Sequence, residues 1–371
     1  MPFKLPLLKD AALGGKRVLL RLDLDLPVAD GVLQGTHRLD RARRTIEFLQ
    51  TQGAKTLIVG HIGRRPEDTL RLVFEYLKTL IPLRFVASLS EAKEEMKNLR
   101  EGEFLLLENL RSFNGETTND SVFATELASC ADIFVNEAFA ASHRAHASII
   151  GLSALLPHYA GPVFSEEVEQ LSKAFSPTHP ALIILGGAKF ETKMPLIAKF
   201  LKIADTVFVC GALANDIYKA RGYEIGTSLV SPRLPPASLR ADPKMQVPVD
   251  VIARGANESK QKSADTVLPN EKIVDAGNES LADLRALIEK AKFVLWNGPL
   301  GEYEAGFEAG TSALALMLAE CDAETIIGGG DSLAVVSKLG LLERFSFVST
   351  GGGAMLEFLA NGTLPGIEAL R

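Results

Sequence analysis

The sequence predicts an α/β protein made of two doubly wound, parallel-sheet (Rossmann-like) lobes that are joined by a hinge helix. Three observations predict this class. Short apolar runs alternate with segments of helical periodicity, these runs are continuous instead of alternating with polar residues, and 371 residues are more than one core usually holds. Continuous apolar runs are typical of parallel strands that are covered by helices on both faces.

Expected strands and helices follow one another along both halves of the chain. In the first half we expect strands at residues 17–25, 55–60, 104–108 and 132–136, with helices around 38–52 and 67–80. In the second half the expected strands are residues 181–185, 206–210, 246–252, 293–296, 325–327 and 345–349. The proline-rich stretch 229–244 is expected to be a loop. Alternation of this kind predicts one doubly wound sheet in each half.

The boundary between the two halves is expected between Pro157 and Pro180. A capped helical stretch over residues 165–175 has prolines on both sides. A single helix in this setting can join two domains and carry a hinge. We therefore expect an N-terminal lobe over residues 1–162, an interdomain helix over 163–176 and a C-terminal lobe over 177–359.

Charge and composition argue against several classes of protein. The formal net charge is −6 and the pI is near 5.7, whereas nucleic-acid binding needs a basic face. No apolar run approaches the roughly 18 residues of a membrane span, and the first residues lack the apolar core of a signal peptide. Cys130, Cys210 and Cys321 are far apart and form no C-x-x-C pair, which indicates reduced thiols and no zinc site. We expect a cytoplasmic protein without nucleic-acid or membrane partners.

Glycine-rich turns follow the expected strands of the second half. They are GGAK at 186–189, NGPLG at 297–301, GGGDS at 328–332 and GGG at 351–353. A strand that ends in glycines and opens a helix presents bare N–H groups at a positive dipole end, which suits phosphate. Several such turns indicate a polyphosphate ligand such as a nucleotide. Neither G-x-x-x-x-G-K-S/T nor G-x-G-x-x-G occurs, which weakens the P-loop and dinucleotide-binding interpretations.

Charged residues beside these turns are candidates for phosphate and ribose binding. Lys189 and Lys193 are four residues apart on one face of the helix after the GGAK turn, where a lysine can reach phosphate oxygens. Asp331 could hold a magnesium ion together with phosphate oxygens, and Glu304 could accept ribose hydroxyls. The alternatives are a pair of solvated lysines, and an N-cap role for Asp331.

Polar side chains follow the expected strands of the first half, where open α/β sheets bind their ligands. These residues are Asp23, Asp25, His61, Arg64, Arg111 and Arg144, with Arg38 opening the first helix. Arginine binds phosphate and carboxylate bidentately, so the cluster suits a small substrate that carries both groups. The alternatives are solvated arginines, turn-capping aspartates and a core position for His61. We interpret His37, His143 and His146 as structural.

The chain resembles the phosphoglycerate kinases. The matching strings are RVLLRLDLDLP, GTHRLD, GHIGRRP, EFLLLENLR, FVNEAFAASHRAHAS, LGGAKFETK, VLWNGPLGEYE, IIGGGDS and STGGGAMLEFL, in the order of the family and over nearly the whole chain. The resemblance implies Mg²⁺-dependent phosphoryl transfer between 1,3-bisphosphoglycerate and ADP, which yields 3-phosphoglycerate and ATP. It also implies that the tail 360–371 packs back on the N-terminal lobe. We expect a monomer.

The resemblance implies roles for particular residues. The N-terminal lobe would bind phosphoglycerate through Asp23, Asp25, Arg38, His61, Arg64, Arg111 and Arg144. The C-terminal lobe would bind ATP or ADP through Gly187, Lys193, Gly211, Asn297, Glu304, Gly329, Gly330, Asp331 and Ser332, with Mg²⁺ at Asp331. The catalytic residues would be Arg38, Lys189, Lys193, Gly351 and Gly352, and closure about the hinge would unite the two ligands.

Some positions depart from the family pattern. Asp25 stands where the family has asparagine, and a second carboxylate there should repel an anionic substrate unless an arginine neutralises it. The family's GGGMA stretch is Cys210-Gly211-Ala212-Leu213-Ala214, Asn136 is followed by Glu137 instead of aspartate, and Arg65 is an extra residue beside Arg64. Two other functions remain: a non-catalytic protein that binds a phosphometabolite or nucleotide on the same scaffold, and a nicotinamide-dependent dehydrogenase.

Overall fold

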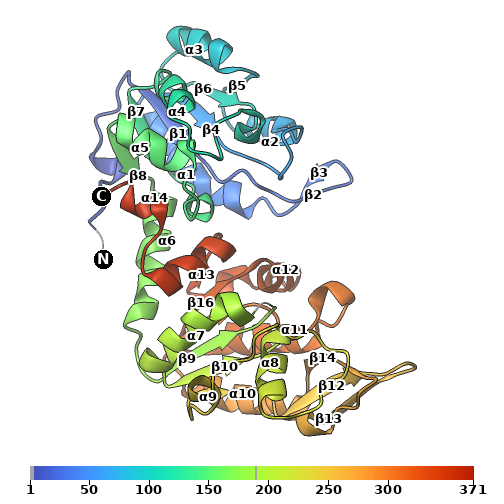
Figure 1. Ribbon diagram of the computed structural model, residues 1–371. Helices are drawn as coiled ribbons and strands as arrows, with labels where there is room; N and C mark the ends of the chain where they lie inside the picture. The colour runs from blue at the N-terminus through green and yellow to red at the C-terminus, as the bar shows by residue number, and fades with distance from the viewer. Residues whose placement is uncertain (1–3, 189) are drawn as a thin grey trace. The chain divides into compact units, whose positions relative to one another are not determined.

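The structure is a computed structural model that describes residues 4–188 and 190–371, apart from the side chains of residues 190–192. The chain divides into two compact units: unit 1 comprises Met1–Glu169 and Asn361–Arg371, and unit 2 comprises Gln170–Ala360. Each unit is built on a parallel sheet with helices (Figure 1), which confirms the predicted α/β class. Within the described residues, no helix is long and apolar enough to cross a membrane.

Unit 1 has a six-stranded parallel sheet in its described part, in the order β5-β6-β4-β1-β7-β8. Its strands are β1 (Arg17–Arg21), β4 (Lys55–Val59), β5 (Leu83–Val86), β6 (Phe104–Leu107), β7 (Ile133–Asn136) and β8 (His158–Ala160). Strand β1 pairs with β4 on one side and with β7 on the other. The chain therefore reverses its direction of strand addition at β1, and the loops after β1, β4 and β7 meet at one edge.

Alternate residues of β1 enter two different cores, which explains its continuous apolar sequence. Val18 and Leu20 belong to the core that α1 (His37–Thr51) and α2 (Arg71–Leu77) complete, whereas Leu19 belongs to the core of α3 (Leu89–Asn98) and α4 (Ser121–Ala128). Both faces of the sheet are therefore covered, as the sequence predicted.

Smaller elements complete unit 1. They are the hairpin β2 (Val28–Ala29) and β3 (Val32–Leu33), the helices α5 (Leu152–Leu155) and α14 (Pro365–Glu368), the π-helical segment η4 (Ala147–Gly151) and the 3₁₀ turns η1 (Leu8–Asp10), η2 (Leu110–Ser112) and η3 (Phe139–Ala141). Helix α6 (Pro162–Ser172) crosses the boundary between the units and continues as η5 (Lys173–Phe175). The amide of Gly366 in the C-terminal segment donates to the carbonyl of Ser142 at 2.9 Å.

Unit 2 has its own six-stranded parallel sheet in the described residues, in the order β11-β10-β9-β15-β16-β17. Its strands are β9 (Ala181–Leu185), β10 (Thr206–Val209), β11 (Met245–Gln246), β15 (Phe293–Asn297), β16 (Glu324–Gly328) and β17 (Phe347–Val348). The order reverses between β9 and β15, so the turns that follow these two strands are neighbours.

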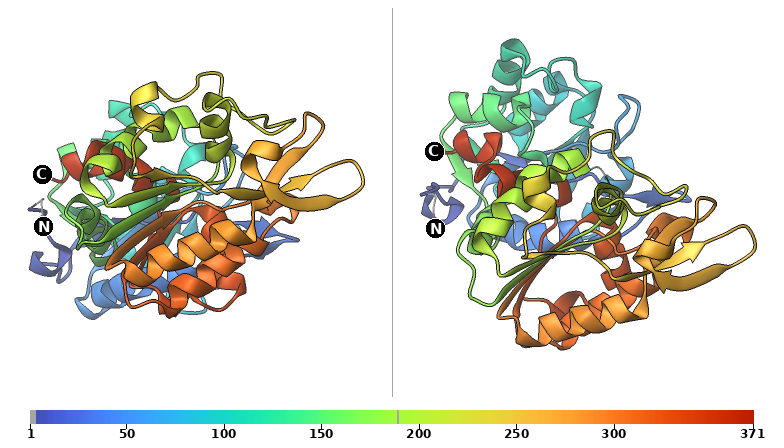
Figure 2. Two further views of the ribbon diagram at one scale, coloured as in Figure 1. Left: turned by 90° about the horizontal axis from the view of Figure 1, so that it is seen from below. Right: turned by 60° about the horizontal axis from the view of Figure 1, so that its bottom comes forward.

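Helices cover both faces of this second sheet (Figure 2). They are α7 (Phe190–Ile203), α8 (Ala212–Ala220), α9 (Ala237–Arg240), α10 (Asn278–Lys290), α11 (Ala309–Glu320), α12 (Gly330–Lys338) and α13 (Gly352–Asn361), with the 3₁₀ turns η6 (Ala264–Thr266), η7 (Tyr303–Ala305) and η8 (Leu342–Arg344). The expected loop 229–244 is irregular except for the short helix α9.

One expected strand was wrong. Residues 246–252 are not a single strand of the parallel sheet: β11 ends at Gln246, and β12 (Asp250–Arg254) belongs to a separate antiparallel sheet with β13 (Ser259–Ser263) and β14 (Lys272–Ala276). The break falls at Val247 and Pro248, because proline has no N–H to donate to a ladder. The extra sheet matters for the site, since β14 lines a pocket.

Candidate active site

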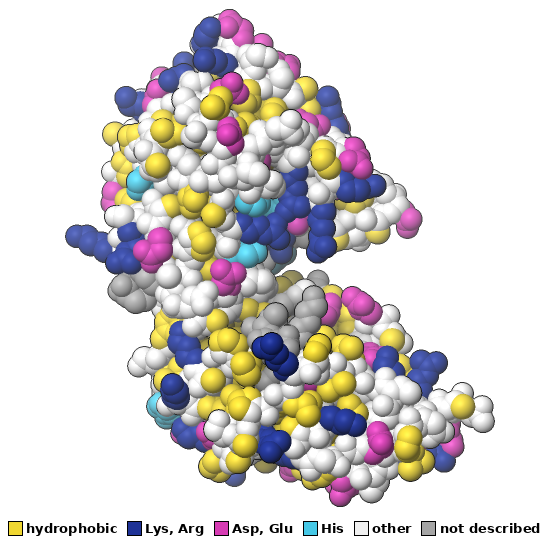
Figure 3. All heavy atoms as spheres, in the orientation of Figure 1, with side chains coloured by type: hydrophobic (Ala, Val, Ile, Leu, Met, Phe, Trp, Pro, Cys, Tyr) yellow, Lys and Arg dark blue, Asp and Glu magenta, His cyan; other side chains and the backbone are white. Residues whose placement is uncertain are grey.

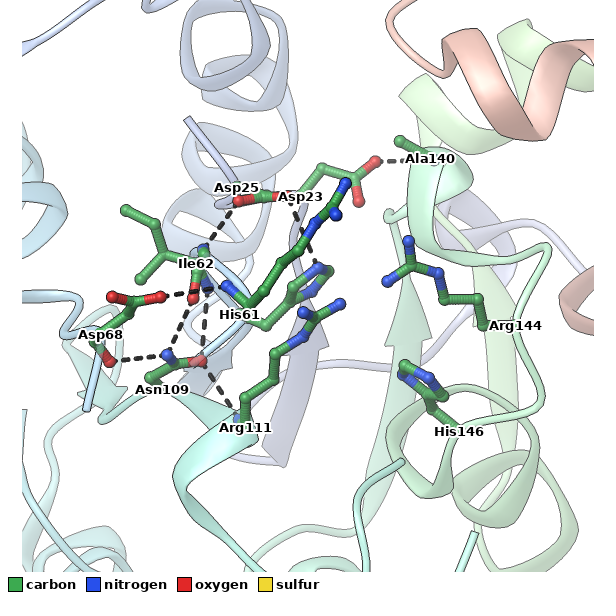
Figure 4. Close-up of polar contacts among 12 residues, drawn as sticks. Asp23, Asp25, His61, Ile62, Asp68, Asn109, Arg111, Ala140, Arg144 and His146 are labelled. Atoms are coloured by element: carbon green, nitrogen blue, oxygen red, sulfur yellow. Dashed lines mark hydrogen bonds and ion pairs between the residues drawn. The ribbon is translucent and has the colours of Figure 1, made fainter. Parts of the chain in front are cut away.

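The ends of the unit 1 strands bring the predicted anion-binding residues together. Asp23 and Asp25 follow β1, His61 and Arg64 follow β4, Arg111 lies in η2 after β6, and Arg144 follows η3 after β7. Figure 4 shows His61, Arg111 and Arg144 directed toward one another from three different loops. Figure 3 shows the matching surface, where lysine, arginine and histidine side chains gather on one face of unit 1.

The two aspartates connect loops that are distant in the sequence. Asp23 accepts a hydrogen bond from the amide of Ala140 at 2.8 Å, and Asp25 accepts one from the amide of Gly63 at 2.9 Å. Burial raises the pKa of Asp23, while the nearby charges of Arg38 and Arg21 act in the opposite direction. These long-range contacts differ from the local bonds of a turn cap, so the turn-capping alternative is not what the structure shows.

Arg111 and Arg144 are the central cations of this cluster. Burial lowers the pKa of Arg111, and the charges of Arg144 and Arg64 lower it further, while Asp25 and Glu116 act in the opposite direction. In the described part of the chain, Nε of Arg111 is buried and has no hydrogen-bond partner. An unsatisfied buried donor among like charges is an arrangement that an anion would stabilise.

Arg64 and Arg65 lie differently, although both are exposed. The guanidinium of Arg65 pairs with Asp68 at 2.9 Å and lies 3.6 Å from Glu67. Arg64 instead contributes to the electrostatic environment of Arg111. Arg38, near the start of α1, donates to the carbonyl of Asp25 at 2.7 Å. Arg64 therefore belongs to the cluster, and Arg65 is held by its own loop.

His61 is both a core residue and a neighbour of the arginines. Its side chain is buried, and one ring nitrogen, Nδ1, lies 2.9 Å from a guanidinium nitrogen of Arg21. Burial lowers the pKa of His61 to about 2, and the charges of Arg21, Arg111, Arg144 and His146 add to this effect. His61 is therefore neutral at physiological pH.

In unit 2 the glycine turns are packed against one another. A Cβ on Gly186 would lie 2.1 Å from the carbonyl oxygen of Pro299, and one on Gly298 would lie 2.5 Å from that of Gly186. A Cβ on Gly352 would lie 3.3 Å from Cα of Gly329. The turns after β9, β15, β16 and β17 thus meet at one edge of the sheet.

A pocket of about 430 Å³ opens beside these turns. Of the predicted residues, it is lined by Gly187, Gly211, Glu304 and Asp331. Its other walls, which the sequence did not reveal, include Ile273, Val274 and Asp275 of β14, and Asn215 and Tyr218 of α8. Asn215 donates through Nδ2 to the carbonyl of Leu229 at 3.0 Å, while its buried Oδ1 has no partner in the described residues.

The remaining predicted residues of unit 2 support the turns or lie at helix starts. Asn297 is the last residue of β15 and is buried, and Ser332 accepts a hydrogen bond from the amide of Gly298 at 3.0 Å. Gly330 opens α12, Gly352 opens α13, and Gly351 directly precedes α13. The hydroxyl of Ser332 therefore holds the glycine turn at Gly298 in place.

Lys193 lies against the first glycine turn. Its Nζ donates to the carbonyl of Gly186 at 2.5 Å, and burial lowers its pKa while Cys210 and Asp331 act in the opposite direction. Lys189 lies outside the described residues. Of the two predicted lysines, Lys193 is the one that the structure describes, and it lies beside the glycine turn that the sequence predicts as a phosphate site.

Asp331 is not the N-cap of α12, because Gly329 occupies that position with a φ of 104° and Asp331 lies in the first turn. Its side chain is exposed at the edge of the pocket. Among the described residues there is no group of three acidic, histidine or cysteine side chains that could hold a metal by itself. A single carboxylate still fits Mg²⁺ bound with a nucleotide, since phosphate and water oxygens supply the other ligands.

Comparisons with known proteins agree with this geometry. The family model described as phosphoglycerate kinase matches residues 8–362. The phosphoglycerate kinase of Leptospira biflexa is 36% identical over 389 residues, covering 99% of this chain and 98% of that protein, and that of Haemophilus influenzae is 37% identical over 376 residues, covering 97% of each.

Two solved structures are similar along their whole length. The phosphoglycerate kinase from Coxiella burnetii has a TM-score of 0.83 and 35% identity, covering 99% of each chain. The enzyme from Pyrococcus horikoshii has a TM-score of 0.86 and 28% identity, covering 98% of each. The chain therefore belongs to the phosphoglycerate kinase family, the kinases that transfer a phosphoryl group to a carboxyl acceptor.

Proposed function

We propose that unit 1 binds 3-phosphoglycerate or 1,3-bisphosphoglycerate with the arginine cluster, and that unit 2 binds ADP or ATP in the pocket beside the glycine turns. The observation that carries this proposal is the pairing of two chemistries in one chain. One site offers guanidinium groups to a small anion, and the other offers backbone amides to a polyphosphate.

In unit 1 the substrate's charged groups would meet Arg38, Arg64, Arg111 and Arg144, and its hydroxyl would meet Asp23. The Nε of Arg111, which has no hydrogen-bond partner among the residues that the structure describes, supports this assignment, because a bound anion would satisfy it. Asp25 and His61 complete the site. Asp25 is anchored by Gly63 in a position to act on the substrate's carboxylate end.

In unit 2 the base and ribose would occupy the pocket that Gly187, Gly211 and Glu304 line, and the phosphates would meet the amides of the turns after β16 and β17. The turn residues for this role are Asn297, Gly329, Gly330, Ser332, Gly351 and Gly352. Asp331 would hold Mg²⁺, which when bound offsets the negative charge of the phosphate oxygens.

The reaction would be a direct in-line transfer without a covalent enzyme intermediate. The phosphoryl group leaves the carboxylate oxygen of the acyl phosphate and is taken by a terminal phosphate oxygen of ADP. Positioning and charge neutralisation do most of the work in such transfers. Arg38, Lys189 and Lys193 would supply positive charge to the phosphoryl group, with help from the amides at Gly351 and Gly352.

Because each unit would hold one ligand, the transfer requires that the two ligands be brought together. Helix α6 and the residues around it are the natural hinge. Small-angle scattering should show compaction when both ligands are saturating, and an unchanged radius of gyration would count against closure. We also expect a cytoplasmic monomer, which size-exclusion chromatography with light scattering can check.

The test of the function is a coupled assay with 3-phosphoglycerate and Mg-ATP on the purified chain. We expect ATP consumption that depends on both substrates and on Mg²⁺. Binding of both ligands without turnover would instead identify a non-catalytic binding protein, an alternative that no observation in the structure favours.

A further inference from the structure

Arg21, the last residue of β1, is a fully buried cation directly beneath the arginine cluster. It lies within an apolar strand and was not among the predicted site residues. Its Nε donates to Oγ of Ser148 at 3.0 Å, one terminal nitrogen donates to the carbonyl of Leu22, and the other lies 2.9 Å from Nδ1 of His61. All three nitrogens of the guanidinium therefore have defined partners inside the protein.

The contact with His61 fixes the state of the histidine ring. A guanidinium only donates hydrogen bonds and keeps its proton at any physiological pH. Nδ1 of His61 must therefore accept, so it carries no proton, and in the neutral ring the proton is on Nε2. A protonated ring would direct an N–H at the N–H of Arg21, which this geometry does not allow.

We propose that Arg21 is a positioning residue that holds His61 as the neutral Nε2–H tautomer, so that His61 offers the bound anion a hydrogen-bond donor and no charge. Nε2 of His61 lies 3.8 Å from Oδ2 of Asp25, too far for a good hydrogen bond, which leaves this donor for a ligand oxygen. That a ligand oxygen uses this donor rests on the proposed function, whereas the assignment of the Nε2–H tautomer does not.

A buried chain of contacts holds Arg21 in this position. Ser148, which is bonded to Arg21, donates through Oγ to Oε1 of Glu116 at 2.6 Å and through its amide to Oε2 at 3.0 Å. Glu116 is itself buried. Its carboxylate therefore compensates the charge of Arg21 through the serine hydroxyl. Removal of the serine hydroxyl should loosen Arg21 and leave its charge in place.

The groups that face His61 all disfavour its protonation except one. Arg21, Arg111, Arg144 and His146 surround it from β1, η2 and the segment before η4, and Asp25 is the carboxylate on the open side. Burial is the largest cause of the low pKa. His61 therefore stays uncharged as the pH falls through the range where a free histidine titrates, and it adds no positive charge to that of the arginines.

Nitrogen NMR of the ring-¹⁵N-histidine-labelled chain tests the inference directly. The chain has six histidines, and comparison with His61→Gln identifies the His61 signals. We expect Nδ1 of His61 to show the shift of an unprotonated nitrogen and Nε2 that of a protonated one, unchanged from pH 8 to about 5. A protonated Nδ1, or a titration near the ordinary histidine value of about 6.5, would overturn the proposal.

Two variants of the same strand separate positioning from general stability. Arg21→Met removes the donor and the charge, so His61 should begin to titrate in the accessible pH range. In this variant, unlike in wild type, phosphoglycerate should then bind more tightly at pH 5.5 than at pH 7.5. Arg17→Met removes a cation at the other end of β1, where it pairs with Asp132 at 2.6 Å, and should leave the His61 signals unchanged. If Arg21→Met does not fold, Ser148→Ala should still shift the His61 signals.

Saturation with 3-phosphoglycerate completes the test. We expect the Nε2 signal to move while Nδ1 stays unprotonated. Unchanged His61 signals in a chain that is active in the coupled assay would refute the donor role and leave the function standing. Absence of both binding and turnover would refute the proposed function instead, while the signals of the free chain would still decide the tautomer.

Discussion

The carboxylate of Asp25 is bonded through Oδ1 to the backbone amide of Gly63 at 2.9 Å. This contact ties the segment after β1 to the segment after β4, at the edge where the arginines gather. Asp25 therefore does not point freely into solvent, although its side chain is about half exposed. Its second oxygen faces the region of His61, where a substrate anion would lie. The carboxylate is therefore held in a fixed position beside the arginine cluster.

Asp25→Asn should strengthen the binding of phosphoglycerate. The amide keeps an oxygen for the Gly63 amide and removes one negative charge. At the effective dielectric of a protein surface, a negative charge several ångströms from an anionic substrate weakens its binding by on the order of 1 kcal/mol. Without this charge, KM for 3-phosphoglycerate should fall about fivefold. The control is Asp30→Asn in the exposed hairpin β2–β3, which should leave KM unchanged. An unchanged or higher KM in Asp25→Asn would show that the carboxylate does not act on the substrate.

Much of this site was predictable because parallel strands end at a common edge. Once residues 17–25, 55–60 and 132–136 were interpreted as parallel strands, the polar residues after them had to be neighbours. The same principle applies to the glycine turns after β9, β15, β16 and β17, which lie together in the structure. Arg21 was not predictable, because a charged residue at the end of an apolar strand gives no sign of whether it is buried beneath a site or exposed.

The pocket wall from β14 was also missed, for a different reason. In the sequence, the strands of an antiparallel sheet that is inserted between two parallel strands resemble further strands of the doubly wound pattern. Residues 246–252 were therefore expected in the wrong sheet. Strands β5 and β8 are short, and each carries partly exposed residues, so neither gives a continuous apolar run. Their existence depends on pairing with β6 and β7, which only the three-dimensional structure reveals.

Arg38→Ala and Lys193→Ala should each lower turnover by about 10²–10³, the usual effect of removing one donor to a transition-state charge. Both side chains are held near the proposed ligands, Arg38 by the carbonyl of Asp25 and Lys193 by that of Gly186. Matched controls lie on the same helices: Arg43→Ala removes an exposed pair with Glu47, and Lys202→Ala removes an exposed lysine. Near-normal kcat in both test variants would rule out these catalytic roles.

Gly211→Ala should weaken nucleotide binding. Gly211 has φ 60° and ψ −149°, a conformation that is essentially restricted to glycine, and a Cβ would lie 2.9 Å from the amide nitrogen of Gly187. The loop that lines the pocket must move, so we expect Kd for ADP to rise about tenfold by calorimetry.

Gly222→Ala at the other end of α8 is the control for Gly211. It has φ 87°, but a Cβ there meets no atom of the described residues within 4 Å. It should cost about 1–3 kcal/mol of stability through backbone strain and leave ADP binding unchanged. Equal nucleotide affinity in the two variants would mean that the close approach of Gly211 to Gly187 has no part in shaping the site.

Gly366→Ala should weaken phosphoglycerate binding although Gly366 is not itself a predicted site residue. A Cβ there would lie 2.5 Å from Oγ of Ser142, whose loop carries Arg144. The displaced loop should raise Kd for 3-phosphoglycerate several-fold, roughly 1 kcal/mol. Gly362→Ala lies in the same C-terminal segment, where a Cβ has no neighbour within 4 Å in the part of the chain that the structure describes, and should leave that Kd unchanged. If the two variants bind alike, the segment does not position the Arg144 loop.

Asp275 gives unit 2 a measurable dependence of stability on pH. Burial raises its pKa from 3.8 to about 6, although the amides of Gly310 and Ala276 bond to its carboxylate. Between about pH 4 and 6 the folded state therefore binds more protons than the unfolded state. The free energy of unfolding should consequently fall as the pH rises through this range, by up to about 3 kcal/mol from this group.

Asp275→Asn isolates this effect, because the amide does not titrate. The substitution itself should cost stability, since an NH₂ group would face one of the two backbone amides, but that cost is the same at every pH. Urea unfolding of both proteins at pH 4 and at pH 6.5 measures the difference. We expect the wild-type advantage to be larger at pH 4, where its carboxyl is protonated. An equal difference at both pH values would show that Asp275 titrates in the folded protein as it does in the unfolded chain.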